Sequence, residues 1–161
     1  MSIWFTSDQH FYHKRIIEIC DRPFVNEEQM RAELIKRHNQ TVKKSDKVFF
    51  LGDFMLGKDK QNLEMIVKSL NGYKTLILGN HDDLKVKDYY AAGFDFVSKY
   101  PIIINKYYML SHAPLFLTPA MPYYNVFGHV HNDMRYETET SHSLCVCVER
   151  HDYRPCKVKG L

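Results

Sequence analysis

Short apolar runs alternate with amphipathic stretches along the chain, and they predict strands separated by helices. Runs rich in β-branched and aromatic residues predict strands at residues 2–7, 47–51, 74–78, 94–99, 102–104, 107–110 and 144–148. Asn26 marks the start of a predicted helix over residues 26–42, and Gly93 the end of another over 84–92. A short helix is predicted at 13–20. The i, i+3, i+4, i+7 spacing predicts an amphipathic helix through Leu63, Ile66, Val67 and Leu70.

The order of these elements predicts the fold class. Through residue 78 the order is β-α-α-β-α-β, which is typical of a mainly parallel sheet with right-handed crossovers. Later, Asn105-Lys106 is predicted as a hairpin turn, and three prolines make residues 113–124 a long loop. With no repeat or linker in the chain, we expect one α/β domain over residues 1–161. It would contain two packed mixed β-sheets flanked by helices.

Composition narrows the class of protein. Hydrophobic residues make up 45% and charged residues 25% of the 161, as in an ordinary soluble globular domain. The net charge of +3 is too small to imply nucleic-acid binding but allows an anionic substrate. The most basic segment, residues 150–159, is interpreted as a solvated tail rather than a phosphate-binding strip. No apolar run is long enough to cross a membrane, so we expect no membrane partner.

The four cysteines point to a cellular compartment. They show neither zinc-knuckle spacing nor the dense framework of a small secreted domain. Cys145 and Cys147 alternate within an apolar run, where small buried hydrophobes are a simpler interpretation than a redox or metal role. With no charged leader before an apolar segment, a reducing cytoplasm is the expected location.

Metal-binding side chains follow five of the apolar runs. In α/β folds, functional groups gather where loops leave the carboxyl ends of the strands. We therefore expect these five loops to meet in one crevice. The stretches are Asp8-Gln9-His10, Gly52-Asp53, Gly79-Asn80-His81-Asp82, Ser111-His112 and Gly128-His129-Val130-His131.

The donor types favour a site with two ions. Carboxylate, imidazole and amide oxygen together suit first-row divalent ions better than a calcium cage or a thiolate zinc site. The set exceeds what one four-coordinate zinc needs, whereas two ions that share a carboxylate would use every donor. Such a pair can lower the pKa of a bridging water from 15.7 toward about 7 and stabilise an in-line displacement. The donors are Asp8, His10, Asp53, Asn80, His112, His129 and His131.

Together and in this order, the five motifs resemble those of the calcineurin-like metallophosphoesterase family. The resemblance implies two divalent transition-metal ions, with Mn²⁺ expected ahead of Fe, Zn or Ni. It implies that Asp8, His10, Asp53 and His131 hold one ion. Asp53 would bridge to a second ion held by Asn80, His112 and His129. It also implies that His81 is not a ligand but faces the substrate phosphate, where it stabilises charge or protonates the leaving oxygen. Asp82 either orients His81 as part of the catalytic set or caps the turn.

The resemblance implies a metal-dependent phosphoric ester hydrolase, in which a metal-bridging hydroxide attacks phosphorus without a covalent intermediate. Gly52-Asp53 is followed by residues 54–57, Phe-Met-Leu-Gly, and not by the second Asp and the Arg typical of protein Ser/Thr phosphatases. A phosphoprotein substrate is therefore disfavoured. The compact length and the segment at residues 21–24 resemble small bacterial and phage members of the family.

Substrate contacts are less well defined. His13 lies one turn past His10 and is a candidate to line the mouth of the site. Arg22 either grips a substrate phosphate bidentately or is a surface charge at a helix end.

A small nucleotide-type phosphodiester is favoured over a monoester, which would require more cationic groups. Nucleic acid and oligomeric state stay open, and a non-catalytic scaffold that binds a protein partner is the competing class. The aromatic residues offered for base stacking, with core packing as the alternative, are Tyr12, Phe54, Tyr123 and Tyr124.

Overall fold

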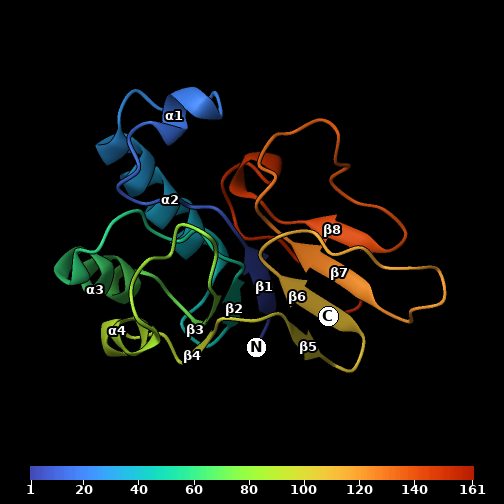
Figure 1. Cartoon of the computed structure of the whole chain (residues 1–161). Coiled ribbons are helices and arrows are strands. Elements are labelled where there is room, and N and C mark those ends of the chain that lie inside the picture. The colour runs from blue at the N-terminus through green and yellow to red at the C-terminus, as the bar shows by residue number, and fades with distance from the viewer.

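The computed structural model describes residues 1–161 and contains two four-stranded β-sheets (Figure 1). The first sheet has the order β1-β2-β3-β4, all parallel, and the second has the order β5-β6-β7-β8, in which only β5 and β6 are antiparallel. This architecture confirms the predicted α/β class. The strands are β1 (Ile3–Thr6), β2 (Lys47–Phe50), β3 (Tyr73–Ile77), β4 (Phe96–Ser98), β5 (Ile102–Ile104), β6 (Tyr108–Ser111), β7 (Tyr124–Phe127) and β8 (Ser143–Cys145).

The helices connect the strands of the first sheet and lie on the side of it away from the second sheet (Figure 1). They are α1 (Ile16–Ile19), α2 (Glu27–Thr41), α3 (Lys60–Ser69) and α4 (Val86–Ala92). The Asn26 side chain accepts from the backbone N–H of Gln29 at 2.9 Å, which caps α2 as predicted. The predicted helix over 13–20 is only one turn long. None of the four combines the length and apolar character needed to cross a lipid bilayer.

The two largest of three buried hydrophobic clusters hold the layers together. The larger, with 21 buried residues, joins the helices to the first sheet and includes Phe50, Phe54 and Phe94 in edge-on contact. The smaller lies between the two sheets, where Phe5 and Leu51 meet residues of β6, β7 and β8. The two sheets therefore pack face to face, and their strand ends are fixed relative to each other.

The end of the chain differs from the prediction. The strand predicted over 144–148 stops at Cys145, because the chain then leaves β8 and crosses to β1. There the N–H of Val148 donates to the carbonyl of Ser7 at 3.1 Å, and a 3₁₀ turn, η1 (Val148–Arg150), follows. The basic end is not a solvated tail, since Tyr153 and Val158 are buried.

Candidate metal centre

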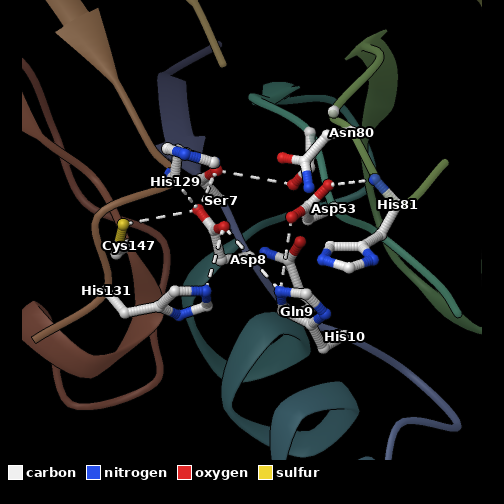
Figure 2. Close-up of polar contacts among 12 residues, drawn as sticks. Ser7, Asp8, Gln9, His10, Asp53, Asn80, His81, His129, His131 and Cys147 are labelled. Atoms are coloured by element: carbon white, nitrogen blue, oxygen red, sulfur yellow. Dashed lines mark hydrogen bonds and ion pairs between the residues drawn. The ribbon is translucent and has the colours of Figure 1, made fainter. Parts of the chain in front are cut away.

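The five predicted loops meet at one site, because they follow the carboxyl ends of β1, β2, β3, β6 and β7. Figure 2 shows Asp8, Asp53, Asn80 and His129 of these loops close together. Backbone bonds join the first two loops directly. The N–H of Asp8 donates to the carbonyl of Gly52, and that of His10 to the carbonyl of Asp53, both at 3.0 Å. All seven predicted donor residues lie in this cluster of loops.

Asp8, His10 and His131 form the first group of donors. Oδ1 of Asp8 lies 3.6 Å from Nε2 of His131 and 3.9 Å from Nε2 of His10. Oδ1 of Asp8 and Nε2 of His10 are both buried, and neither has a hydrogen-bond partner. A buried polar atom without a partner carries a desolvation penalty. A cation between these atoms would remove that penalty, so the residues fit a metal ion.

Asp53, His112 and His129 form the second group. Nε2 of His112 lies 2.9 Å from Oδ1 of Asn80 and 3.1 Å from Nδ1 of His129. Nδ1 of His112 faces the carbonyl of Leu51 at 2.8 Å, which directs Nε2 toward the other donors. The imidazoles and the amide oxygen therefore surround one point beside Asp53.

Asp53 lies between the two groups. Its Oδ2 is 3.5 Å from Nε2 of His10 and 3.5 Å from Nε2 of His112. Its other oxygen, Oδ1, accepts the N–H of His81 at 2.8 Å, which fixes the orientation of the carboxylate. One carboxylate oxygen thus borders both groups.

The electrostatics of the two groups favour added positive charge. Burial raises the pKa of Asp8, because the desolvated carboxylate resists ionisation. Burial lowers the pKa of His112, but its hydrogen bond and charge interaction with Asp53 and the charge of Asp8 outweigh burial and raise that pKa to about 9. Burial also lowers the pKa of His131, but Cys20, Glu149 and Asp8 raise it to about 10. Divalent ions would supply the charge that protons on these imidazoles otherwise provide.

The backbone around the donors is tight and strained. A Cβ added at Gly79 would collide with the Asp53 carboxylate, and one at Gly128 would collide with the Ser7 hydroxyl. These collisions explain why glycine precedes the polar residues in those two motifs. Left-handed backbone is costly for residues other than glycine and gathers at functional sites. The site residues that adopt it are Asp8 (φ 63°), His10 (φ 52°), Asp53 (φ 52°), His129 (φ 71°) and His131 (φ 47°).

The model of the calcineurin-like phosphoesterase family matches residues 1–146, a range that includes every donor described above and His81. The chain belongs to this family. Members of the family are in general metal-dependent hydrolases, and both donor groups are candidate metal-binding groups of this member, as is a third group, Cys20, His131 and Glu149.

Curated relatives match only about half of the chain. The uncharacterized protein MJ1445 of Methanocaldococcus jannaschii is 46% identical over 81 residues, which are 50% of this chain and 46% of that protein. The Gene 66 protein of Mycobacterium phage L5 is 42% identical over 82 residues, which are 49% of this chain and 39% of that protein. The matched stretch thus spans less than half the length of these relatives.

Two solved structures resemble the whole fold. A protein of unknown function, AQ665 from Aquifex aeolicus, superposes with a TM-score of 0.69 at 27% identity and covers 96% of this chain and 95% of that one. The nuclease MPE of Pseudomonas putida superposes with a TM-score of 0.52 at 17% identity, over 80% of this chain and 61% of that one. The second likeness concerns the fold alone.

In this member of the phosphoesterase family, two further histidines lie beside the donors. The rings of His81 and His10 lie side by side (Figure 2), with their centres 5.3 Å apart, and the ring of His81 is centred 6.0 Å from that of His13. Nδ1 of His13 lies 3.1 Å from Nδ1 of His10. The backbone N–H of His81 is held by Asp53, whereas its imidazole makes no hydrogen bond. The rings of His81 and His13 therefore lie beside His10, at the first group of donors.

Asp82 serves the turn rather than His81. Oδ2 of Asp82 accepts the backbone N–H groups of Asp53 and Gly79, each at 2.8 Å, and Oδ1 accepts that of Phe54 at 3.0 Å. The carboxylate makes no hydrogen bond with the imidazole of His81. Of the two predicted roles, the geometry supports turn capping, which ties the Asp53 loop to the Gly79 loop.

Arg22 is neither a surface charge nor a phosphate grip. Its side chain is fully buried, and its guanidinium donates to the carbonyls of Asp8 (2.7 Å) and Gln9 (2.9 Å) and to the carboxylate of Glu149. A guanidinium whose donors are used inside the protein has none left for a substrate. The predicted substrate contact at Arg22 is therefore wrong.

Two of the aromatic residues offered for base stacking lie elsewhere. Phe54 has no exposed surface and belongs to the larger core. Tyr124 begins β7, at the opposite end of that strand from His129, and packs near Tyr107 and Tyr108. For both residues the core-packing alternative is the correct one.

Three residues that support the centre are absent from the predicted set. The Ser7 hydroxyl donates to Oδ2 of Asp8 at 2.5 Å, and the Cys147 thiol donates to the same oxygen at 3.3 Å (Figure 2). Nδ1 of His131 meets Glu149 at 2.9 Å. Ser7 adjoins a motif and could have been suspected. Cys147 and Glu149 lie beyond the last motif, and no spacing in the sequence connects them to Asp8 or His131.

Proposed function

We propose that the protein is a dinuclear metal-dependent phosphoesterase that hydrolyses a small nucleotide-type phosphodiester. The observation that carries the proposal is the place of Asp53, whose Oδ2 lies 3.5 Å from an imidazole nitrogen of each donor group. A carboxylate shared by two groups of donors is suited to hold two cations close together.

Each donor then has a role. Asp8, His10 and His131 would hold one ion, and Asn80, His112 and His129 the other, while Asp53 contacts both. Divalent ions held there would supply charge stabilisation for the phosphoryl oxygens and would lower the pKa of a water for direct attack on phosphorus. The chain itself supplies the fixed geometry, since Asp82 holds the Asp53 loop and Ser7 and Cys147 hold Asp8.

His81 is proposed as the proton donor to the leaving oxygen. Its ring is free of hydrogen bonds within the protein and lies beside His10, so it can face a phosphate held at the ions. His13, adjacent to both rings, is proposed as a second contact for that phosphate. General acid catalysis of this kind contributes about 10²–10⁴-fold to the rate.

A diester is favoured over a monoester by the charge near the donors. A monoester carries one more negative charge, and Arg22, the cation that the sequence offered for a substrate phosphate, is committed to Glu149 and two carbonyls. The proposed nucleotide character is supported by Tyr12, which adjoins His13 and is only partly buried. Its ring already stacks with the Arg31 guanidinium at 4.5 Å, so a base would extend an existing stack.

The donor atoms also bear on which ion the site would hold. Imidazole nitrogen with carboxylate and amide oxygen suits Mn²⁺, Fe, Zn or Ni, and we propose Mn²⁺ as the first to test.

All four cysteines are free thiols. Free thiols persist in a reducing environment, so we propose that the protein works in the cytoplasm.

The test is turnover by protein stripped of metal and then resupplied with Mn²⁺. We expect hydrolysis of bis-p-nitrophenyl phosphate to exceed that of p-nitrophenyl phosphate, and a chelator to abolish both. A cyclic nucleotide, a dinucleotide and a sugar phosphate assayed side by side would then define the substrate. Protein that binds two ions but turns over none of these substrates would instead support the scaffold alternative.

A further inference from the structure

The 3₁₀ turn η1 lies beyond the part of the chain that matches the family model, residues 1–146. Nevertheless it contacts both loops of the first donor group. Its Glu149 reaches the side chain of His131, and through Arg22 it reaches the backbone of the Asp8 loop. This turn therefore connects parts of the centre that are more than 100 residues apart in sequence.

Arg22 joins the turn to the loop that carries Asp8 and His10. Nη2 donates to the carbonyl of Asp8 at 2.7 Å, and Nη1 donates to that of Gln9 at 2.9 Å. Nε and Nη2 both donate to Oε1 of Glu149, at 3.0 and 2.6 Å. The planar guanidinium thus holds two successive carbonyls of the strained loop and one carboxylate at once.

Glu149 joins the same turn to His131. Its Oε1 lies 2.9 Å from Nδ1 of His131, so an N–H on Nδ1 donates to it and Nε2 is directed toward Oδ1 of Asp8. Its other oxygen, Oε2, is buried without a hydrogen-bond partner. The charge of Glu149 is balanced inside the protein by the Arg22 guanidinium, which donates twice to Oε1. Arg150, the next residue, holds the carbonyl of His131 at 2.6 Å.

The second donor group has no comparable ion pair. The imidazole of His112 is oriented by the carbonyl of Leu51, a neutral backbone group. The side chain of His129 meets His112, and the oxygen of Asn80 also meets His112. The buried charges of Arg22 and Glu149 therefore serve one group of donors and not the other.

We propose that Glu149 and Arg22 are positioning residues for the first ion alone, the one assigned to Asp8, His10 and His131. This inference rests on the proposed two-ion function. Glu149→Gln keeps the size and an acceptor oxygen but removes the charge that balances Arg22. The guanidinium then faces the Asp8 loop as an uncompensated buried cation, which opposes a metal ion there. Loss of such a supporting carboxylate typically weakens metal binding about 10–100-fold.

The test counts and distinguishes the ions without using activity. Metal-free wild type and Glu149→Gln are titrated with Mn²⁺ by calorimetry and examined by EPR. The wild type should bind two ions per chain and give the spectrum of a coupled pair. In Glu149→Gln one ion should bind about 10–100-fold more weakly and the other within about twofold of wild type. At intermediate Mn²⁺ the coupled signal should give way to that of isolated Mn²⁺.

Two further variants make the result decisive. Arg22→Lys keeps the charge but cannot hold two carbonyls and a carboxylate together, so it should also weaken one ion selectively. If Glu149→Gln does not fold, Arg22→Lys tests by itself whether the ion pair supports only the first ion. Glu137→Gln, at an exposed carboxylate, should behave as wild type. A wild type that binds fewer than two ions would refute the proposed function and this inference together. A two-ion wild type whose Glu149→Gln and Arg22→Lys variants bind both ions normally, or lose both equally, would refute the inference alone.

Discussion

The carboxylate of Asp53 lies between the imidazoles of His10 and His112, with Oδ2 at 3.5 Å from Nε2 of each. Asp8 differs, because its side chain groups with His10 and His131, and it meets the second group only through the backbone N–H of His129, at 2.8 Å from Oδ2. The centre therefore depends on Asp53 more than on any other single donor, because every other donor serves one ion.

Asp53→Asn should reduce metal content from two ions to one or none at micromolar Mn²⁺, and turnover should fall with it. The amide keeps an oxygen for the N–H of His81 but no longer supplies the negative charge that offsets two cations. Metal per chain, measured by mass spectrometry after gel filtration, checks this. Asp83→Asn, at an exposed carboxylate near the same turn, is the matched control and should keep both ions.

His81→Ala should keep its metal and lose about 10²–10⁴-fold in turnover, because His81 touches no donor with its ring and is assigned to proton transfer. The loss should be smaller for a substrate whose leaving group is a good anion without protonation. Assays on an aryl and an alkyl diester measure that difference, and His142→Ala, at an exposed histidine, is the control. Full activity in the variant would remove His81 from the mechanism.

The positions of the donors could be predicted because each follows an apolar run that forms a strand. Parallel strands bring their carboxyl ends to one edge, so identifying strands sufficed to bring Asp53 and Asn80 together. The hairpin at Asn105-Lys106 was equally local, although Ile104 pairs with Tyr108, so three residues rather than the predicted two separate β5 from β6. Asn105 and Lys106 have positive φ, and the N–H of Tyr107 donates to the carbonyl of Ile104 at 3.1 Å.

The surroundings of the donors could not be predicted from local pattern. Arg22 follows a short helix, and in sequence it is indistinguishable from a solvated arginine; only Glu149, 127 residues later, explains its burial. The strand predicted through Val148 failed for a similar reason. Residues 146–148 are apolar and would be buried equally well beside β7 or beside β1. The chain crosses to β1 because Cys147 and Val148 pair with Ser7, which lies near the other end of the sequence.

Asp82→Asn tests whether this residue stabilises the loops or orients His81. Its carboxylate accepts backbone N–H groups from Asp53, Phe54 and Gly79, and an amide would turn an N–H toward some of these donors. We expect the free energy of unfolding, measured by urea titration of metal-free protein, to fall by about 2 kcal/mol. Unchanged stability together with a His81→Ala-like loss of turnover would instead support the orienting role.

His38 should make the stability of the protein depend on pH, independently of the metal centre. Its ring is buried against Phe50, and Nε2 donates to the carbonyl of Asn71 at 2.9 Å. Burial lowers the pKa of His38 from 6.5 to about 4. Between these values the unfolded chain binds a proton at this residue and the folded protein does not. The contribution is therefore complete above about pH 6.5, is lost as pH falls toward 4, and amounts to about 3 kcal/mol in total.

His38→Gln isolates this effect, because the amide can still donate to the Asn71 carbonyl but does not titrate. With a chelator present in both samples, wild type should lose about 2 kcal/mol more unfolding free energy than the variant between pH 7 and pH 5. Guanidinium titrations at pH 7, 6 and 5 measure the two curves. If the curves run parallel, the buried histidine is not the source of the acid sensitivity, and the remaining pH dependence belongs to groups that both proteins share.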